Sequence, residues 1–480
     1  MAQSSNKTKP WLRAAEARRE RERTQAREEA AQFSALGVAL DARCAELGLK
    51  LTPWGDDTLG APNLRPNRQL QRALHLSDGA GEMEMPLRLS SLGIVRQLTT
   101  DLSSDLMLLP EHAGIIQVSR GYIEAIIEDV HTRSGGGLRP STYYIDQHLF
   151  ASQDGVFRRG PGEITFAPTE EGIAVEISRP SALFTALEAR LSAPSPYGDD
   201  WPELVTIKIS GAKLHDRVHG HAVLKAVANS CSIGLEARFG RGFVLSPRFD
   251  WDGFWERGGA RSVQRSRPEA ARQPLPLMLN EYTSNALSYY WDARKLESTP
   301  IHAYNAYYKV LEYHFQRYAV ESGIRLLRKQ MRDPRIDLAD DHDAAALLAA
   351  VQDQVRKRNS KEELLAMTLA ICIEPHDMAK FIASDVALSR HLARRDVLAG
   401  VPAIPKATRR DELVKRVAER LSKLRNQTVH AEGDIEDGRN LLLVPGTSAA
   451  LSVSEDVKLI RHCALTVMIA SSRPLDVERL

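Results

Sequence analysis

The spacing of apolar residues changes along the chain and predicts three parts. From 13 to 33, charged residues of both signs alternate and nearly every apolar residue is alanine, which is typical of an exposed helix with i,i+4 ion pairs. From about Pro86, apolar residues recur at every second position, as in strands. From Leu277 they recur at every third or fourth position, as in helices.

Short runs of alternating apolar residues predict the strands of the middle part. They stand at 115–118, 163–166, 173–177 and 204–209. The second and third runs are expected to form a hairpin around Pro168 to Gly172. Helical spacing predicts short helices at 181–192 and 222–228. A mixed, mainly antiparallel sheet domain is therefore expected at roughly 85–260.

Helix start signals recur in the C-terminal part. Thr299 precedes Pro300, as an N-cap precedes a proline at the first helical position. Apolar and aromatic residues behind it share one helix face, which predicts packing against a neighbouring helix: Tyr304, Tyr308, Leu311, Phe315 and Tyr318. The segment 360–363 forms a capping box, and further helices are expected at 375–395 and 455–472. Short connections between these helices predict an antiparallel bundle.

A long amphipathic helix is predicted from Arg409. Its apolar face repeats at spacings of three and four: Leu413, Val417, Leu421, Leu424 and Thr428. Thr408, with Asp411 three residues on, is expected to cap the start of this helix. Gly433 follows the last periodic residue, where helices usually stop.

The expected fold class is α+β with several domains. The expected parts are a charged helical arm and loop at 1–80, a mixed α/β recognition domain at 81–262, a linker at 263–275 and an all-helical domain at 276–480. Trp251, Phe254 and Trp255 precede a run of arginines close to the linker. Such aromatics either wedge two domains together or, beside arginine, stack on single-stranded nucleic acid.

Composition narrows the classes of function. The chain has 480 residues, 43% of them hydrophobic, and a net charge of +2, so it is long enough for two or three domains and has no global basic field for nucleic acid. Its four cysteines are far apart, which argues against a disulfide framework or a zinc knuckle and favours a reducing compartment. No stretch resembles a signal peptide or a membrane span. A cytoplasmic location without a membrane partner is therefore expected.

Two segments of the middle part are candidates for ligand binding. His215, His219 and His221 offer imidazoles to a metal, yet Gly220 disfavours a helix through them and a polar loop is the preferred interpretation. The serine and glycine run at 134–137 lacks the strand–loop–helix context of a phosphate-binding loop and is interpreted as a turn. No metal and no cofactor are expected.

Arg425, Asn426 and His430 stand at or just beyond the end of the long helix predicted from Arg409. The six residues from Arg425 to His430 resemble the R-x4-H motif of the HEPN superfamily. The segment 306–315, with a Leu-Glu pair among aromatics, resembles the early helix of HEPN domains of the Abi and ApeA type. The resemblance covers about the last 200 residues of the chain.

The resemblance implies a metal-independent endoribonuclease that cleaves RNA through the 2′-hydroxyl of the RNA itself. His430 would act as general acid or base, because its unperturbed pKa lies near cellular pH. Arg425 would hold the phosphate with its planar fork, and Asn426 would orient His430 or contact the phosphate. In the superfamily two such motifs face each other across a dimer cleft, so the active site is expected at a homodimer interface.

Other residues have supporting roles or simpler explanations. Glu312 needs a partner because unpaired burial of a carboxylate is costly, and Arg425 is one candidate. Four cations of the same predicted helix would attract the RNA backbone: Lys415, Arg416, Arg420 and Lys423. Without the resemblance, Arg425 and His430 simply favour the helix dipole and cap a carbonyl.

The resemblance also implies a defence or toxin-type system that arrests growth, as in abortive infection. The expected partners are an RNA substrate, a second copy of the chain, and a phage-derived or cognate regulatory protein recognised by the middle domain. The competing prediction is a non-catalytic dimeric scaffold that binds a nucleotide or a partner protein. RNA cleavage in EDTA by the wild type, compared with an Arg425→Ala/His430→Ala variant, separates these two alternatives. Loss of cleavage in EDTA would instead indicate a metal-dependent nuclease, a third alternative.

Overall fold

The computed structural model describes most of the chain. The described ranges are 10–53, 72–77, 81–87, 89, 92–130, 164–191, 205–247, 275–277, 279–333, 335–336, 340–343, 345, 347–349, 360–394, 398, 400–429, 443 and 447–477. The predicted turn at 134–137, the whole aromatic and arginine segment near the linker, and His430 lie outside these ranges.

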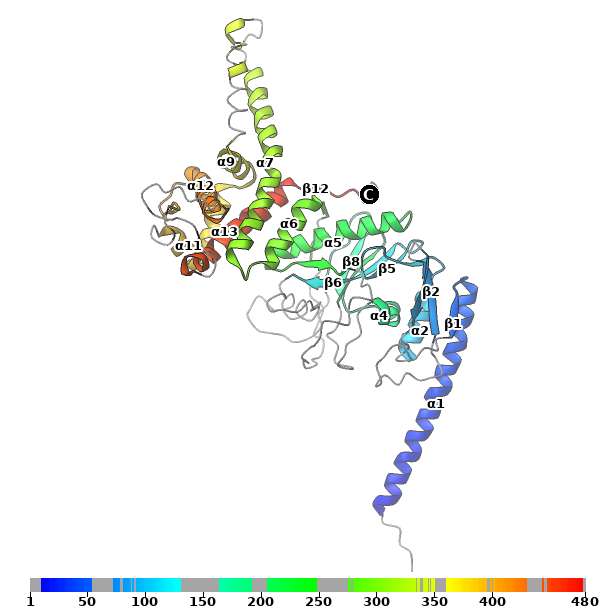
Figure 1. The fold of residues 1–480 in the computed structure, drawn as a ribbon. Helices are drawn as coiled ribbons and strands as arrows, with labels where there is room; N and C mark the ends of the chain where they lie inside the picture. Colours follow the sequence, from blue (N-terminus) through cyan, green and yellow to red (C-terminus); the bar gives the residue numbers. More distant parts are fainter. Residues whose placement is uncertain are drawn as a thin grey trace, which may run out of the picture.

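The described residues form helices and strands in three parts that follow the chain (Figure 1). The helices are α1 (Pro10–Glu46), α2 (Leu92–Asp101), α4 (Ala182–Leu191), α5 (Arg217–Phe239), α6 (Ser284–Lys295), α7 (Pro300–Met331), α9 (Lys361–Cys372), α10 (Pro375–Ser384), α11 (Val386–Ala393), α12 (Arg410–Val429) and α13 (Ser448–Ser471). The strands are β1 (Leu51–Pro53), β2 (Arg72–Ser77), β3 (Glu82–Pro86), β4 (Leu106–Leu108), β5 (Gly114–Gln117), β6 (Tyr122–Asp129), β7 (Ile164–Thr165), β8 (Ala174–Ser178), β9 (Thr206–Ser210), β10 (Phe243–Leu245), β11 (Asn280–Glu281) and β12 (Arg473–Pro474).

The main sheet has the strand order β1-β2-β4-β5-β6-β9-β8-β7, with β3 added at β2 and β10 at β6. Within the described strands, β2 and β4 pair in parallel and the other ladders are antiparallel. The prediction of a mixed, mainly antiparallel sheet is confirmed. The predicted hairpin is also present as β7 and β8, where Ile164 pairs with Ile177 and Gly172 has a φ of 87° in the connecting turn.

Both faces of the sheet are covered, which explains the runs of consecutive apolar residues in its central strands. Ile115 of β5 packs with residues of α2, α4 and the end of α1, whereas the next residue, Ile116, packs with α5. Successive strand residues point to opposite faces, so a strand buried on both sides needs apolar residues at neighbouring positions. Figure 1 shows α5 on one side of the sheet and α2 and α4 on the other.

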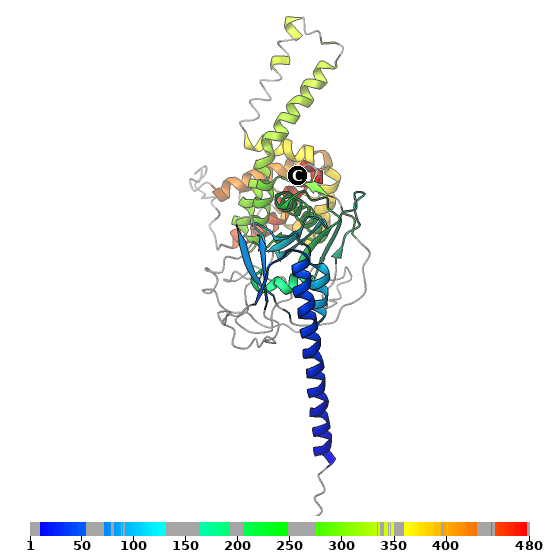
Figure 2. The same cartoon turned by 90° about the vertical axis from the view of Figure 1, so that its right-hand side faces the viewer.

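The two ends of the charged helix α1 differ in their surroundings. Residues 18–25 are exposed, and the N-terminal half of the helix runs away from the sheet, as Figures 1 and 2 show. Its end packs on the sheet through Leu40 and Cys44, which are buried. Strands β1 and β2 come after α1 in the chain and pair with each other in the main sheet, so the sheet includes residues upstream of position 81.

The helical part is built around α7, whose aromatic stripe is buried as predicted. Tyr304 of this stripe donates a hydrogen bond to the carbonyl oxygen of Leu421 in α12 at 2.7 Å, so the hydroxyl is satisfied inside the core. The distal half of α7 projects from the molecule on the side opposite to α1 (Figure 2). In the described part of the chain, no helix combines the length and apolarity needed to cross a bilayer.

Three predicted helix boundaries are corrected. Ser360 caps α9 as predicted, accepting from the Glu363 amide, but Thr408 does not cap α12: its hydroxyl donates to the Pro405 carbonyl, and the helix begins at Arg410. The single helix predicted at 375–395 is two, because Asp385 adopts an extended conformation and caps α11 through the Leu388 amide. The last helix begins at Ser448, before the predicted residue 455.

The sheet and the helical part share a buried polar junction. Arg294 of α6 lies 3.0 Å from Glu236 of α5, and the side chains of both are 1% exposed. The hydroxyl of Tyr290 donates to the same carboxylate at 3.0 Å. After α13 the chain returns to the sheet part, where Leu475 and Val477 pack on the core beneath α5.

Candidate functional site

Arg425 lies near the C-terminal end of α12, where this helix contacts α7. Its Nη2 is 3.9 Å from Glu312 Oε1, and its Cζ is 5.8 Å from the centre of the Tyr308 ring. Both distances are within the usual limits for an ion pair and a cation–π contact. The arginine side chain is 16% exposed, so it keeps some access to solvent. The contact between Arg425 and Glu312 that the sequence suggested is present.

Glu312 lies between two cations. Its Oε1 accepts a hydrogen bond from Lys361 Nζ at 2.8 Å, and the lysine side chain is 59% exposed. Lys361 is the first residue of α9, so three helices contribute to the group formed by Arg425, Glu312 and Lys361. Glu312 is therefore paired with two cations, one partly buried and one at the surface.

Tyr308 forms the floor beneath Arg425. Burial of the ring and the nearby Glu312 carboxylate raise the pKa of Tyr308 to about 12, although the Arg425 guanidinium opposes this shift. Tyr308 therefore stays a neutral phenol over the physiological range, and its electron-rich face is available to the guanidinium.

The end of α12 is held against α7 by a polar contact. Thr428 donates to Asn305 Oδ1 at 2.8 Å, which fixes the last turn before His430. Asn426 is exposed and lies about 100° round the helix from Arg425, given 3.6 residues per turn. The structure therefore brings Glu312 to Arg425, leaves Asn426 on a neighbouring, solvent-facing side, and does not describe His430.

Arg420 is wrongly predicted as a cation available to RNA. Its guanidinium is buried with Asp456 of α13, with Arg420 Nε 2.7 Å from the Asp456 carboxylate. Lys415, Arg416 and Lys423 are exposed on α12. The spacing from Val417 to Leu424 could have revealed the difference, because Arg420 lies between them on the same apolar face.

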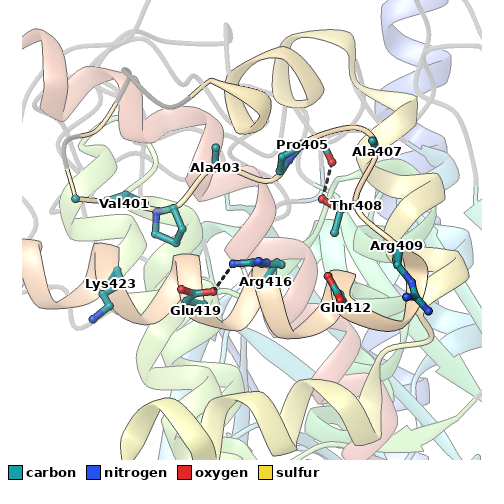
Figure 3. Close-up of a pocket in the computed structure, with 12 residues that line it drawn as sticks. Val401, Ala403, Pro405, Ala407, Thr408, Arg409, Glu412, Arg416, Glu419 and Lys423 are labelled. Atoms are coloured by element: carbon teal, nitrogen blue, oxygen red, sulfur yellow. Dashed lines mark hydrogen bonds and ion pairs between the residues drawn. The ribbon is translucent and has the colours of Figure 1, made fainter.

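A groove of about 670 Å³ runs along α12 beside the loop at 400–409 (Figure 3). Its charged lining residues include Arg416 and Glu419, which form an ion pair at 3.2 Å. Lys423 lines the groove, and it lies about 200° round the helix from Arg425. The groove is therefore on the other side of α12 from the group around Arg425, and its mixed charges do not define an anion site.

His219 and His221 lie in α5, so the prediction of a polar loop is wrong for these two, whereas His215 does lie in the segment that precedes the helix. Asp216 caps α5 by accepting from the His219 amide at 2.8 Å, and the helix begins at Arg217. Position 220, in the first turns of α5, needs glycine because a Cβ there would lie only 2.0 Å from Ile116 Cδ1. The glycine thus permits close packing of α5 on the sheet.

His221 meets a histidine and a glutamate that are distant in sequence. Its Nε2 is 2.8 Å from His112 Nδ1 and 3.9 Å from Glu111 Oε2. Burial lowers the pKa of His112 to about 4, with smaller effects of His221 and Lys225 in the same direction, and burial also lowers the pKa of His221. Sequence spacing carries no signal for this pair, since 109 positions separate the two histidines.

Comparison of the chain with protein-family models, curated proteins and solved structures finds no match.

Proposed function

We propose that the chain is a metal-independent endoribonuclease whose active site lies at the C-terminal end of α12. The observation that supports this most strongly is the environment of Arg425. Its guanidinium is partly exposed, lies above the Tyr308 ring, and is positioned by Glu312. Such a guanidinium offers parallel donors to two phosphate oxygens. In the sequence, His430 follows after four positions.

In the proposed reaction the 2′-hydroxyl of RNA attacks the adjacent phosphorus. One His430 imidazole accepts the proton from that hydroxyl, and an imidazolium gives a proton to the departing 5′-oxygen. The products are a 2′,3′-cyclic phosphate and a 5′-hydroxyl, so no metal and no external nucleophile is consumed. Arg425 stabilises the negative charge that grows on the phosphorane oxygens. Glu312 and Tyr308 act as positioning residues, because they touch the guanidinium and not the RNA.

The spacing of the two residues favours a dimeric site. In a regular helix, positions five apart differ by about 140° round the axis, so Arg425 and His430 of one chain would not face the same point. A second copy placed antiparallel at this surface brings an arginine and a histidine from each chain to one phosphate. Homodimerisation is thus part of the proposal, as is an RNA substrate guided by an exposed cation beside Arg425, Lys361.

The test is RNA cleavage by the purified chain in EDTA. Transfer RNA and total RNA are incubated with the wild type, with Arg425→Ala and with His430→Ala. We expect each variant to lose about 100-fold or more in cleavage rate, because each removes a group that acts in the transition state. Arg325→Ala is the matched control, since Arg325 is an exposed arginine of α7 that pairs with Glu321.

The cleavage products and the quaternary state complete the test. A cyclic phosphate end supports the proposed attack by the 2′-hydroxyl. Equal cleavage by wild type, Arg425→Ala and His430→Ala would refute the assignment of the site. Absence of cleavage by the dimeric wild type with every RNA and with cell extract carrying phage proteins would favour a non-catalytic scaffold.

A further inference from the structure

Three potential metal ligands converge at the edge where the β4–β5 connection meets α5. Glu111 and His112 come from the connection and His221 from the second turn of the helix. One ligand atom from each lies within 4.8 Å of the other two. His221 is buried, His112 is half-buried and Glu111 is exposed, so the group has a closed side made of imidazoles and an open side that faces solvent.

Rigid elements hold both histidines in place. His112 forms a β-bridge with Pro247, and the next amide, that of Ala113, donates to the Ser246 carbonyl at 3.0 Å. His221 is fixed by α5, which packs tightly on β5 at Gly220. Ligands positioned before binding lose little conformational freedom when an ion arrives.

We propose that Glu111, His112 and His221 bind a zinc ion whose fourth position is open to water or to a further ligand. Imidazole nitrogens and carboxylate oxygens bind zinc at about 2.0–2.2 Å, so two ligand atoms of a tetrahedral site lie about 3.4 Å apart. The observed separations of 2.8 Å and 3.9 Å lie on either side of that value. Rotation of the exposed Glu111 side chain and a small shift of the rings are sufficient.

The ligand set selects among common cations. Two imidazoles and one carboxylate suit zinc and its neighbours in the first transition row, whereas calcium and magnesium prefer oxygen ligands. No net proton is lost on binding. The hydrogen now shared between His112 Nδ1 and His221 Nε2 moves to the far nitrogen of the donating ring by tautomerisation, which leaves both lone pairs for the metal.

Lys225 competes with the ion for Glu111. Its Nζ is 3.5 Å from Glu111 Oε2, and its side chain is 48% exposed. The ammonium can therefore turn into solvent when zinc takes its place. The bound metal would join the β4–β5 connection to α5. This site is distant in the chain from Arg425 and does not depend on the proposed ribonuclease activity.

Zinc binding by the full chain tests the proposal. The protein is stripped with a chelator and titrated with zinc in competition with a chromophoric chelator, and cobalt is used as a coloured substitute. We expect one zinc equivalent and the visible absorption of four-coordinate cobalt. Glu111→Gln and His112→Gln should weaken zinc binding by at least about 10-fold. Lys225→Ala should tighten it, because a competing cation is removed.

Two control variants separate the site from adventitious binding. His215→Gln removes a neighbouring histidine outside the trio, and Glu171→Gln removes an exposed glutamate at the β7–β8 turn. Both should bind zinc as the wild type does. A wild type without a stoichiometric zinc, or a loss in His215→Gln as large as in His112→Gln, would overturn the proposal. The cobalt spectrum of the wild type gives the answer even if a histidine variant folds poorly.

Discussion

At the scale of single residues, Asp456 is the clearest case of a buried charged side chain that stabilises the fold. Its carboxylate lies 2.7 Å from Arg420 Nε and 2.7 Å from His391 Nε2, and Arg420 also donates to the Pro402 carbonyl at 2.9 Å. Burial alone would raise the pKa of Asp456, but the hydrogen bond with His391 and the Arg420 guanidinium hold it below its usual value. This group connects α13, α12 and α11.

Removal of the Asp456 carboxylate should destabilise the protein strongly. Asp456→Ala leaves the Arg420 guanidinium buried without its counter-charge, which costs about 3–5 kcal/mol of unfolding free energy. Glu455→Ala is the control at the adjacent position, because Glu455 pairs with the partly exposed Lys458 and such a pair contributes about 0–1 kcal/mol. Urea unfolding of both variants measures the difference. Equal losses would show that Asp456 does not stabilise the interior in this way.

The sequence predicts only in part which charged residues have a structural role and which are candidates for function. The aromatic face of α7 was predictable from spacing alone, and Glu312 stood out because a carboxylate beside that face needs a partner. Arg420 was misassigned because a long apolar stripe can include an arginine whose partner lies 36 positions away. Lys361 carries no spacing signal toward Glu312 either, since the contact depends on how α9 crosses α7.

At the scale of elements, α5 shows how one glycine can mislead a sequence interpretation. Glycine lowers helix propensity, so the sequence favours a loop for the histidine segment. In the structure the segment is helical, and the absence of a side chain at Gly220 lets α5 lie close to Ile116 of β5. The strands were more predictable, because alternating or consecutive apolar residues follow directly from whether one or both faces are covered.

Two glycines of α5 should respond in opposite directions to the same substitution. Gly220→Ala places a methyl group against Ile116, and overpacking of this kind costs about 1–3 kcal/mol. In Gly234→Ala the new Cβ has no neighbour within 4 Å, so the variant should gain about 0.5–1 kcal/mol from improved helix propensity. Thermal or urea unfolding gives both values. A stabilised Gly220→Ala would mean that α5 does not pack on β5 as described.

At the scale of the whole molecule, neutral histidines that are wholly or partly buried couple folding to pH. Burial lowers the pKa of three histidines to about 4: His112, His314 and His462. In the unfolded chain a histidine has a pKa of about 6.5, so between these values the unfolded state binds more protons than the folded state. The contribution of these histidines to the unfolding free energy is therefore fully present above the unfolded pKa, and it is lost as the pH falls toward 4.

His462→Phe should make the protein less sensitive to acid. The His462 ring stacks on Phe381 with 3.8 Å between centres and 3° between planes, and phenylalanine keeps that stack without a titrating group. Between pH 7 and 5, we expect the variant to lose roughly 1 kcal/mol less unfolding free energy than the wild type. This value is smaller than the full pKa shift would give, because the His462 ring is partly exposed to solvent. His302→Gln, at an exposed position of α7, should leave the pH dependence unchanged. If both variants lose stability with pH as steeply as the wild type, then His462 does not contribute to acid unfolding.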